Sequence, residues 1–251
     1  MFKHYANNNV CHLCSASKVV PERLYTDHGP TARWQAERVS HEDYVNNFGP
    51  GRLPRLARVK GFFLRRVFID SMHTVDMGVA PHVVGNILWE IVTTAEEFGT
   101  DSRAKRLERA YIAYRQFCSE IGVTCVSTTW KPEKLNKNSA TDYPFMKAKA
   151  VECKKMAPFC YALCEKYNSG SEHDQQRMAV IWGLLEYYKT IKRAGRYLLL
   201  AELEHLQHVI YVLLKCYNSL RIEAIQLDDR RLTQPVWSFL AQLFDRACYL
   251  L

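Results

Sequence analysis

The chain has 251 residues, and 34 Lys and Arg against 26 Asp and Glu give it a formal net charge of +8. Hydrophobic residues make up 48% of the chain and charged residues 24%. This composition excludes disordered, fibrous and collagen-like proteins, and a chain of this length can bury a core without disulfides. The basic balance permits contact with nucleic acid but does not by itself indicate it.

Three features predict an intracellular protein with no membrane partner. The first seven residues contain no apolar stretch of the kind found in a secretory signal. The longest apolar stretches, such as residues 209–214, are far shorter than the ~20 residues of a membrane span. The nine cysteines are odd in number and scattered, which is typical of reduced thiols rather than of a disulfide scaffold.

The chain order predicts a mainly α fold in two parts. Residues 1–65 form an irregular N-terminal segment, because Pro and Gly interrupt it repeatedly, and a small zinc site would stabilise it. Residues 66–251 form a helical domain. It opens with one short strand at 66–70 and continues with about six helices.

Apolar residues at helical spacing predict these helices. Pro81 fits the first turn of the first one, Asp101 and Ser171 are candidate N-caps, and Pro158 should kink or split the third. A loop or weak hairpin separates the second helix from the third. The predicted ranges are 81–97, 101–121, 144–167, 171–193, 197–220 and 234–250. The apolar stripe of the helix at 197–220 consists of Leu199, Leu203, Leu206, Ile210, Leu213 and Tyr217.

The clearest local motif is the C-x-x-C pair Cys11 and Cys14. Two thiolates at this spacing can share a tetrahedral zinc, which then needs two further ligands. Alternatively, the two residues are free cysteines near the N-terminus. Candidates for the further ligands are His4, His12, His28, His41, His73 and His82.

A second motif places Asp70 at the end of the predicted strand and His73 three residues later. An acid and a histidine in this arrangement suit a metal or an acid–base site. Alternatively, Asp70 caps the following turn and His73 is a half-buried side chain with ordinary partners.

Basic residues concentrate in three stretches, 52–66, 103–109 and 147–155. Such stretches attract phosphate, although the last one can also be a solvated helix face with pairs to Glu152. The candidate nucleic-acid contacts are Arg52, Arg55, Arg58, Lys60, Arg65, Arg66, Lys147, Lys149, Lys154 and Lys155.

The order of these motifs resembles the C-terminal half of CACTA-like transposases of cut-and-paste DNA elements. The matching series runs from Cys11-x-x-Cys14 through Asp70-x-Met72-His73 and Gly78 to Lys147-Ala148-Lys149-Ala150-x-Glu152. The resemblance spans residues 8–220. It implies a remnant of a nuclease whose acidic triad holds two divalent metal ions such as magnesium, and a nuclear location.

Carried over residue by residue, the resemblance makes Asp70 and Glu152 vestigial catalytic acids. It makes Cys11 and Cys14 zinc ligands and adds His73 to the D-x-x-H segment; His82 is a further metal-ligand candidate. The sequence departs from the family in two places. The ten residues before Cys11 contain no acid, and residues 221–251 contain no histidine where the family has a paired-histidine segment.

The expected function is therefore that of a catalytically inactive, transposase-derived fragment that retains DNA binding. The alternative is a helical protein-interaction module with no role in nucleic-acid binding. Its contact surface would be the last helix, with Val236, Phe239, Leu240, Leu243 and Phe244.

Overall fold

A computed structural model describes residues 8, 14–25, 27, 31–47, 53, 55–64, 71–125, 127, 129–137, 142–195 and 197–231. Over these residues the fold is mainly helical, as the sequence predicts. The described residues divide into two compact units, one up to Thr74 and the other from Val75 onward. The predicted strand at 66–70 and the predicted helix at 234–250 lie outside the described residues.

The first unit contains short elements around a few large buried side chains. Its helices are η1 (Pro21–Arg23), α1 (Arg33–Ala36), α2 (His41–Asn46) and η2 (Arg55–Arg58). Trp34 is fully buried and its indole N–H donates to the carbonyl of Asp27 at 2.8 Å. Ser40 caps α2, because its hydroxyl accepts from the backbone N–H of Asp43. Irregular backbone therefore encloses a small core here. This agrees with the irregular segment that the repeated Pro and Gly residues predict.

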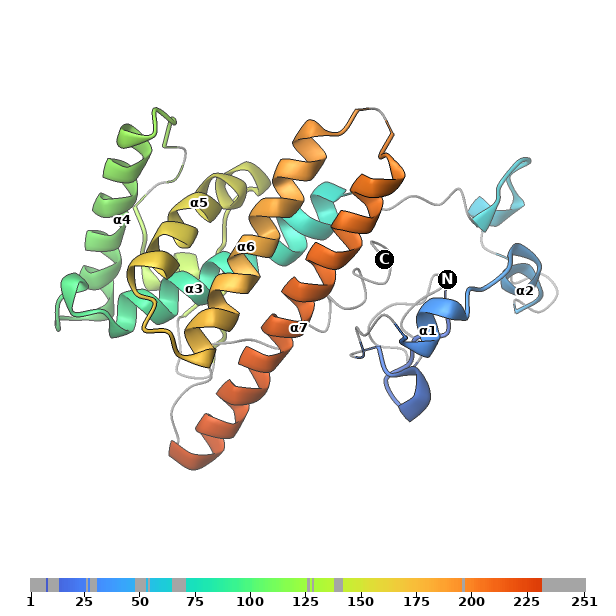
Figure 1. Cartoon of the computed structure of the whole chain (residues 1–251), viewed down its shortest axis with the longest axis horizontal. Coiled ribbons are helices and arrows are strands. Elements are labelled where there is room, and N and C mark those ends of the chain that lie inside the picture. Colours follow the sequence, from blue (N-terminus) through green and yellow to red (C-terminus); the bar gives the residue numbers. More distant parts are fainter. Residues whose placement is uncertain are drawn as a thin grey trace. The chain divides into compact units, whose positions relative to one another are not determined.

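The second unit is built from five long helices, which Figure 1 shows in sequence colours. A π-helical segment, η4 (Met72–Val79), leads into the first of them. The long helices are α3 (Ala80–Thr94), α4 (Arg103–Glu120), α5 (Ala150–Lys166), α6 (Glu172–Arg193) and α7 (Leu200–Arg231). The short 3₁₀ helices η5 (Glu96–Phe98) and η6 (Pro132–Leu135) lie in the connections. No described helix is long and apolar enough to cross a membrane.

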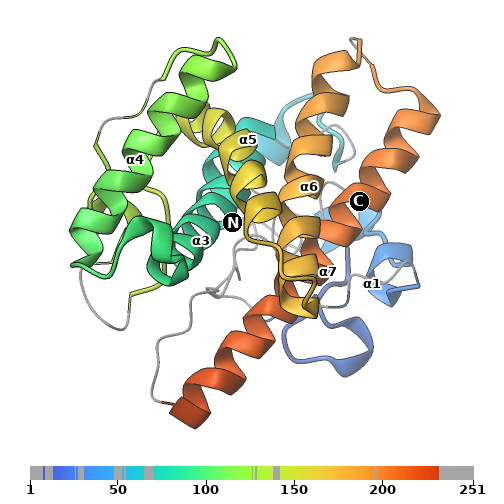
Figure 2. The ribbon, with the colours of Figure 1, turned by 60° about the vertical axis from the view of Figure 1, so that its left-hand side comes forward.

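Helix α3 is the centre of this unit, with contacts to α4, α5 and α6. Twelve of its fifteen residues are buried, from Ala80 to Val92 with the exception of His82. A helix that is apolar on all sides must be covered on all sides. The three neighbouring helices and the segment before α5 supply that cover (Figure 2).

The segment before α5 crosses α3 at a glycine. A Cβ atom at Gly85 would lie 2.7 Å from the backbone N of Met146. The Met146 N–H in turn donates to the carbonyl of Pro81 at 2.9 Å. Because this segment is extended, α5 begins at Ala150 rather than near Pro144, where the sequence predicted it.

Helices α6 and α7 form a long antiparallel hairpin. Ser171 caps α6 as predicted, since its hydroxyl accepts from the N–H of Asp174. Gly183 allows the close approach, because a Cβ there would lie 3.0 Å from the Cβ of Leu213. Helix α7 begins three residues later than predicted and extends eleven residues further.

Other local expectations need correction. Asp101 does not cap α4; it pairs with Arg109, and Ser102 occupies the N-cap position. Pro158 does not split α5, which is one helix from Ala150 to Lys166. Of the two alternatives for residues 122–143, a loop or a weak hairpin, the described residues there form a loop that contains η6 and no strand. None of the cysteines in the described ranges forms a disulfide, in agreement with the expectation of reduced thiols.

Candidate functional site

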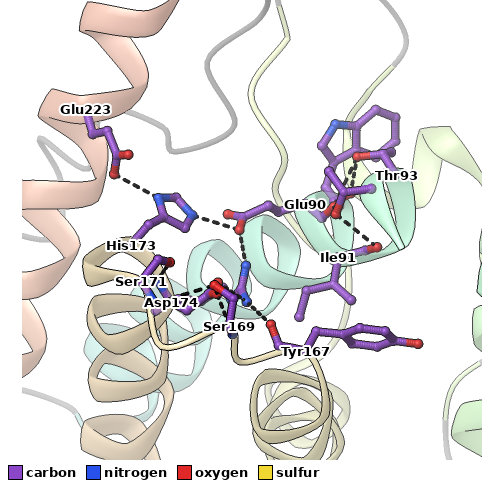
Figure 3. A network of polar contacts seen from close by, with 12 residues as sticks. Glu90, Ile91, Thr93, Tyr167, Ser169, Ser171, His173, Asp174 and Glu223 are labelled. Atoms are coloured by element: carbon purple, nitrogen blue, oxygen red, sulfur yellow. Dashed lines mark hydrogen bonds and ion pairs between the residues drawn. The ribbon is translucent and has the colours of Figure 1, made fainter. Parts of the chain in front are cut away.

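A buried network of charged side chains joins three helices at the N-terminal end of α6 (Figure 3). At its centre is Glu90, which lies in the C-terminal third of α3 and is only 8% exposed. One oxygen of its carboxylate accepts hydrogen bonds from Arg177 and from Nε2 of His173, the latter at 2.8 Å. A buried carboxylate needs such partners, because transfer of an unpaired charge out of water is costly.

Arg177 connects Glu90 to the loop between α5 and α6. Its guanidinium contacts the carboxylate of Asp174 at 2.5 Å and donates to the carbonyl of Tyr167 at 3.2 Å. Asp174 also accepts from the backbone N–H of Ser169 at 2.8 Å. These contacts fix the position at which the chain turns from α5 into α6.

His173 connects the same network to α7. Its Nε2 faces Glu90 and its Nδ1 lies 2.8 Å from the carboxylate of Glu223. A carboxylate on each side of the ring favours the imidazolium form, in which both nitrogens donate. The hydrogen bond to Glu90, with the charges of Glu90 and Glu223, raises the pKa of His173 to about 9 against the opposing effect of burial.

An open pocket of about 320 Å³ lies over this histidine, between the start of α6 and the C-terminal half of α7. Its lining includes Glu172, Gln176, Ser219 and Glu223. Polar groups and the side chain of Ile222 line the pocket, but both ring nitrogens of His173 are engaged by carboxylates. The histidine is therefore not available as a general base, and the network acts chiefly to hold α3, α6 and α7 together.

Sequence patterns do not predict this network. Its signal is Glu90, a charged residue in the middle of the predicted apolar helix, which requires a buried partner. The sequence does not show which partner, because Arg177 and His173 lie more than 80 residues away along the chain.

The structure brings together the segments that carry two of the sequence motifs. His82 packs against Phe145 with ring centroids 4.8 Å apart and the rings tilted by 57°, and burial lowers the pKa of His82 to about 4. Burial, the negative charge of Glu152 and, to a smaller extent, that of Asp76 raise the pKa of Cys153 to about 12. The residues after Asp70 and those around Glu152 are thus neighbours in space.

Glu152 performs a structural task at this junction. It is buried in the first turn of α5, where its carboxylate accepts from the backbone N–H of Lys149 at 2.8 Å. Its other oxygen lies 3.8 Å from the ammonium of Lys134. An acid at the third position of a helix commonly caps it in this way.

The predicted metal ligands are not gathered into one site within the described ranges. Cys11 and Asp70 lie outside those ranges, and Cys14 is buried in the first unit. His73 is exposed in η4. Among the residues described, no three His, Cys, Asp or Glu side chains are arranged to hold a metal ion.

The predicted basic stretches differ in what their side chains contact. Arg55, Arg58 and Lys60 are exposed in the first unit, whereas Arg52, Arg65 and Arg66 fall outside the described residues. In the stretch at 103–109, Arg106 and Arg109 donate to the carbonyls of Ala95 and Phe98, just after α3. Those two arginines therefore stabilise a turn of the chain.

The stretch at 147–155 instead contributes to an exposed basic surface. Helices α5 and α6 are antiparallel, so the start of α5 lies beside the end of α6, and the Lys154 ammonium lies 4.8 Å from the centre of the Tyr188 ring. Lys155 lies there too and is half-buried, with its ammonium 3.4 Å from the carbonyl of Thr124. We name the exposed cations of this region the basic end: Lys147, Lys149, Lys154, Lys192 and Arg193.

The acids near the basic end are already engaged. Glu152 caps α5 and faces Lys134, while Glu186 contacts Lys189 and lies 3.7 Å from His205. Asp76 is a further acid near Tyr188, and its charge contributes to the raised pKa of that tyrosine. The five exposed cations of the basic end outnumber these three acids.

Comparisons with protein-family models, with curated proteins and with solved structures found no match for this chain. The functional interpretation accordingly depends on its own residues.

Proposed function

We propose that this chain binds the phosphate backbone of DNA through the basic end, as a transposase-derived fragment without catalytic activity of its own. The observation that carries the proposal is the convergence of exposed cations from two elements on one end of the α5–α6 pair. Lysine and arginine side chains presented in this way attract nucleic acid independently of its sequence.

The proposal assigns binding rather than hydrolysis because of Glu152. In the family that the sequence resembles, this acid would hold a catalytic metal ion. Here its carboxylate is buried and contacts the backbone of Lys149 and the side chain of Lys134. Metal coordination at Glu152 would compete with the cap of α5.

The experiment is a titration of a fluorescently labelled duplex with the full chain at ~150 mM salt, at which phosphate contacts are still measurable. The test variant Lys149→Gln/Lys192→Gln removes one cation from each of the two elements. The matched control Lys105→Gln/Arg115→Gln removes two exposed cations from α4. Both variants lower the net charge by the same amount.

We expect the test variant to bind the duplex at least about 10-fold more weakly. Each lost phosphate contact removes the favourable free energy of releasing counterions from the DNA. The control should bind within about twofold of wild type, because non-contacting surface charges act only through the screened field. Equal losses in the two variants would show that only net charge matters. Absence of wild-type binding would favour the protein-interaction alternative.

A further inference from the structure

The turn between α6 and α7 exposes an unusual group of apolar side chains. Leu199 is 69% exposed and Leu200 is 72% exposed, although a soluble surface rarely gathers several leucines. Ordered contacts hold them in place, because Glu202 accepts from the N–H of Leu199 at 2.8 Å and so begins α7. We name this region the hairpin tip: Ile191, Lys192, Arg193, Tyr197, Leu198, Leu199, Leu200 and Leu203.

The exposed leucines continue the buried stripe of α7. Leu206, Val209 and Leu213 of this helix are buried. Leu199 and Leu203 extend the same face by one turn, but α6 has already ended at Arg193. Helical spacing predicts that both residues belong to one apolar stripe, and the structure shows that this stripe continues beyond the end of α6.

Charge indicates what kind of surface the hairpin tip fits. Residues 191–203 contain three bases and a single acid, Glu202, whose carboxylate accepts from the N–H of Leu199. Lys192 and Arg193 are exposed immediately before the leucines. Two such tips would repel each other, so association of one tip with another is disfavoured, and an anionic partner is favoured.

The apolar chemistry narrows the choice further. Nucleic-acid bases are recognised chiefly by stacking on planar side chains, whereas the exposed apolar groups here are mostly branched alkyl chains. Alkyl side chains beside cations are typical of protein segments that lie in the interface of a membrane. The absence of a spanning helix among the described residues concerns crossing of the bilayer and not contact with its surface.

We infer that the hairpin tip docks on an anionic lipid surface. Leu199 and Leu200 enter the boundary between headgroups and acyl chains, and Lys192 and Arg193 contact the anionic headgroups. This contact goes beyond the proposed nucleic-acid binding and does not depend on it. The inferred contact is with the membrane surface and involves no described helix that crosses the bilayer.

The test is co-sedimentation of the full chain with vesicles of an equimolar mixture of phosphatidylserine and phosphatidylcholine, and with vesicles of phosphatidylcholine alone. The apolar variant is Leu199→Ser/Leu200→Ser, and its matched control is Ile112→Ser/Ile121→Ser on α4, where the two side chains are 59% and 48% exposed. The charge variant is Lys192→Gln/Arg193→Gln, and its control is Lys105→Gln/Arg115→Gln. Thermal unfolding and DNA affinity are measured on each protein.

We expect wild type to bind the anionic vesicles at least about 10-fold more tightly than the neutral ones. The apolar variant should lose about 10-fold or more in vesicle affinity, because it removes leucine burial in the lipid. The charge variant should lose about 30-fold on anionic vesicles, at about 1 kcal/mol per cation. Both controls should stay within about twofold of wild type.

Four outcomes would overturn the inference. They are no vesicle binding by wild type, anionic binding that the leucine substitutions leave unchanged, a dimer that the apolar variant dissociates, and DNA affinity that falls with the leucines. The last two would identify the tip as a protein interface or as a DNA contact. Because Lys192 and Arg193 also belong to the basic end, the apolar variant separates the two sites: a loss of its lipid binding with unchanged DNA affinity would distinguish the hairpin tip from the proposed DNA surface.

Discussion

The two ends of helix α6 use the same kinds of charged side chain in opposite ways. At the N-terminal end, Arg177 is buried and contacts the carboxylates of Glu90 and Asp174. At the C-terminal end, Lys192 and Arg193 are exposed. A buried cation that meets carboxylates fixes the fold, whereas exposed cations are available to an anionic partner.

The difference has a simple consequence for experiments. Substitutions at the buried network should change the free energy of unfolding far more than those at the basic end. Substitutions at the basic end should change ligand binding and leave the fold intact. Four measurements of unfolding test this comparison, beginning with the largest expected effect.

Arg177→Met should lower the free energy of unfolding by about 3–5 kcal/mol, because it leaves the buried carboxylate of Glu90 with one cationic partner fewer. Urea denaturation measures the loss. The double variant Arg177→Met/Glu90→Gln should recover part of it, since the unpaired charge is then removed as well. A loss below about 1 kcal/mol for the single variant would show that the network does not hold the helices together.

The stability of the chain should fall as the pH rises from about 6.5 to about 9. The folded-state pKa of His173 is raised to about 9, so the folded protein holds this proton more tightly than the unfolded chain. The contribution is fully present below the unfolded pKa of about 6.5 and is lost as the pH rises through about 9, by at most about 3 kcal/mol. In His173→Gln the dependence between about pH 6.5 and pH 8 should largely disappear, whereas above pH 8 both proteins should lose stability because burial also raises the pKa of the Cys153 and Cys164 thiols. An unchanged dependence between about pH 6.5 and pH 8 would assign it to other groups.

Glu152→Ala should lower the free energy of unfolding by about 1 kcal/mol, because the N–H of Lys149 loses its acceptor at the start of α5. The matched control is Glu165→Ala, which removes an exposed acid at the other end of the same helix. Removal of that acid near a helix C-terminus should be neutral or slightly stabilising. Equal losses in the two variants would argue against the capping role.

Lys192→Gln should change the free energy of unfolding by less than about 0.5 kcal/mol, as is usual for an exposed residue. Its DNA affinity should nevertheless fall, because the substitution removes one phosphate contact. Chemical denaturation and the duplex titration are measured on the same preparation. A clear loss of stability would erase the distinction between the two ends of α6.

Much of the fold could be predicted from the periodicity of the sequence. The long helices lie where apolar residues recur at helical spacing, and Ser171 caps α6 as its position before an acidic first turn predicts. The predicted start of α5 was wrong, because the segment that crosses α3 at Gly85 carries no periodic pattern of apolar residues to mark it as non-helical. The predicted cap at Asp101 was wrong, because the carboxylate of Asp101 pairs with Arg109 instead. Residue spacing does not reveal this contact.

The site was less predictable for the same physical reason. The sequence identified Glu152 and the lysines around it, but not that Glu152 is occupied as a helix cap. It also missed the network of Glu90, His173 and Arg177, which forms only when three helices pack together. The zinc pair and Asp70 stay predictions, since Cys11 and Asp70 lie outside the described residues.

The salt dependence of duplex binding tests the central claim most directly. The logarithm of the binding constant is measured against the logarithm of salt concentration for wild type and for Lys147→Gln/Lys149→Gln/Lys154→Gln/Lys192→Gln. We predict that the four substitutions make the slope shallower by about 3–4, since each phosphate contact contributes about 0.9. A slope and affinity that the four substitutions leave unchanged would contradict the assignment of the basic end as the nucleic-acid surface.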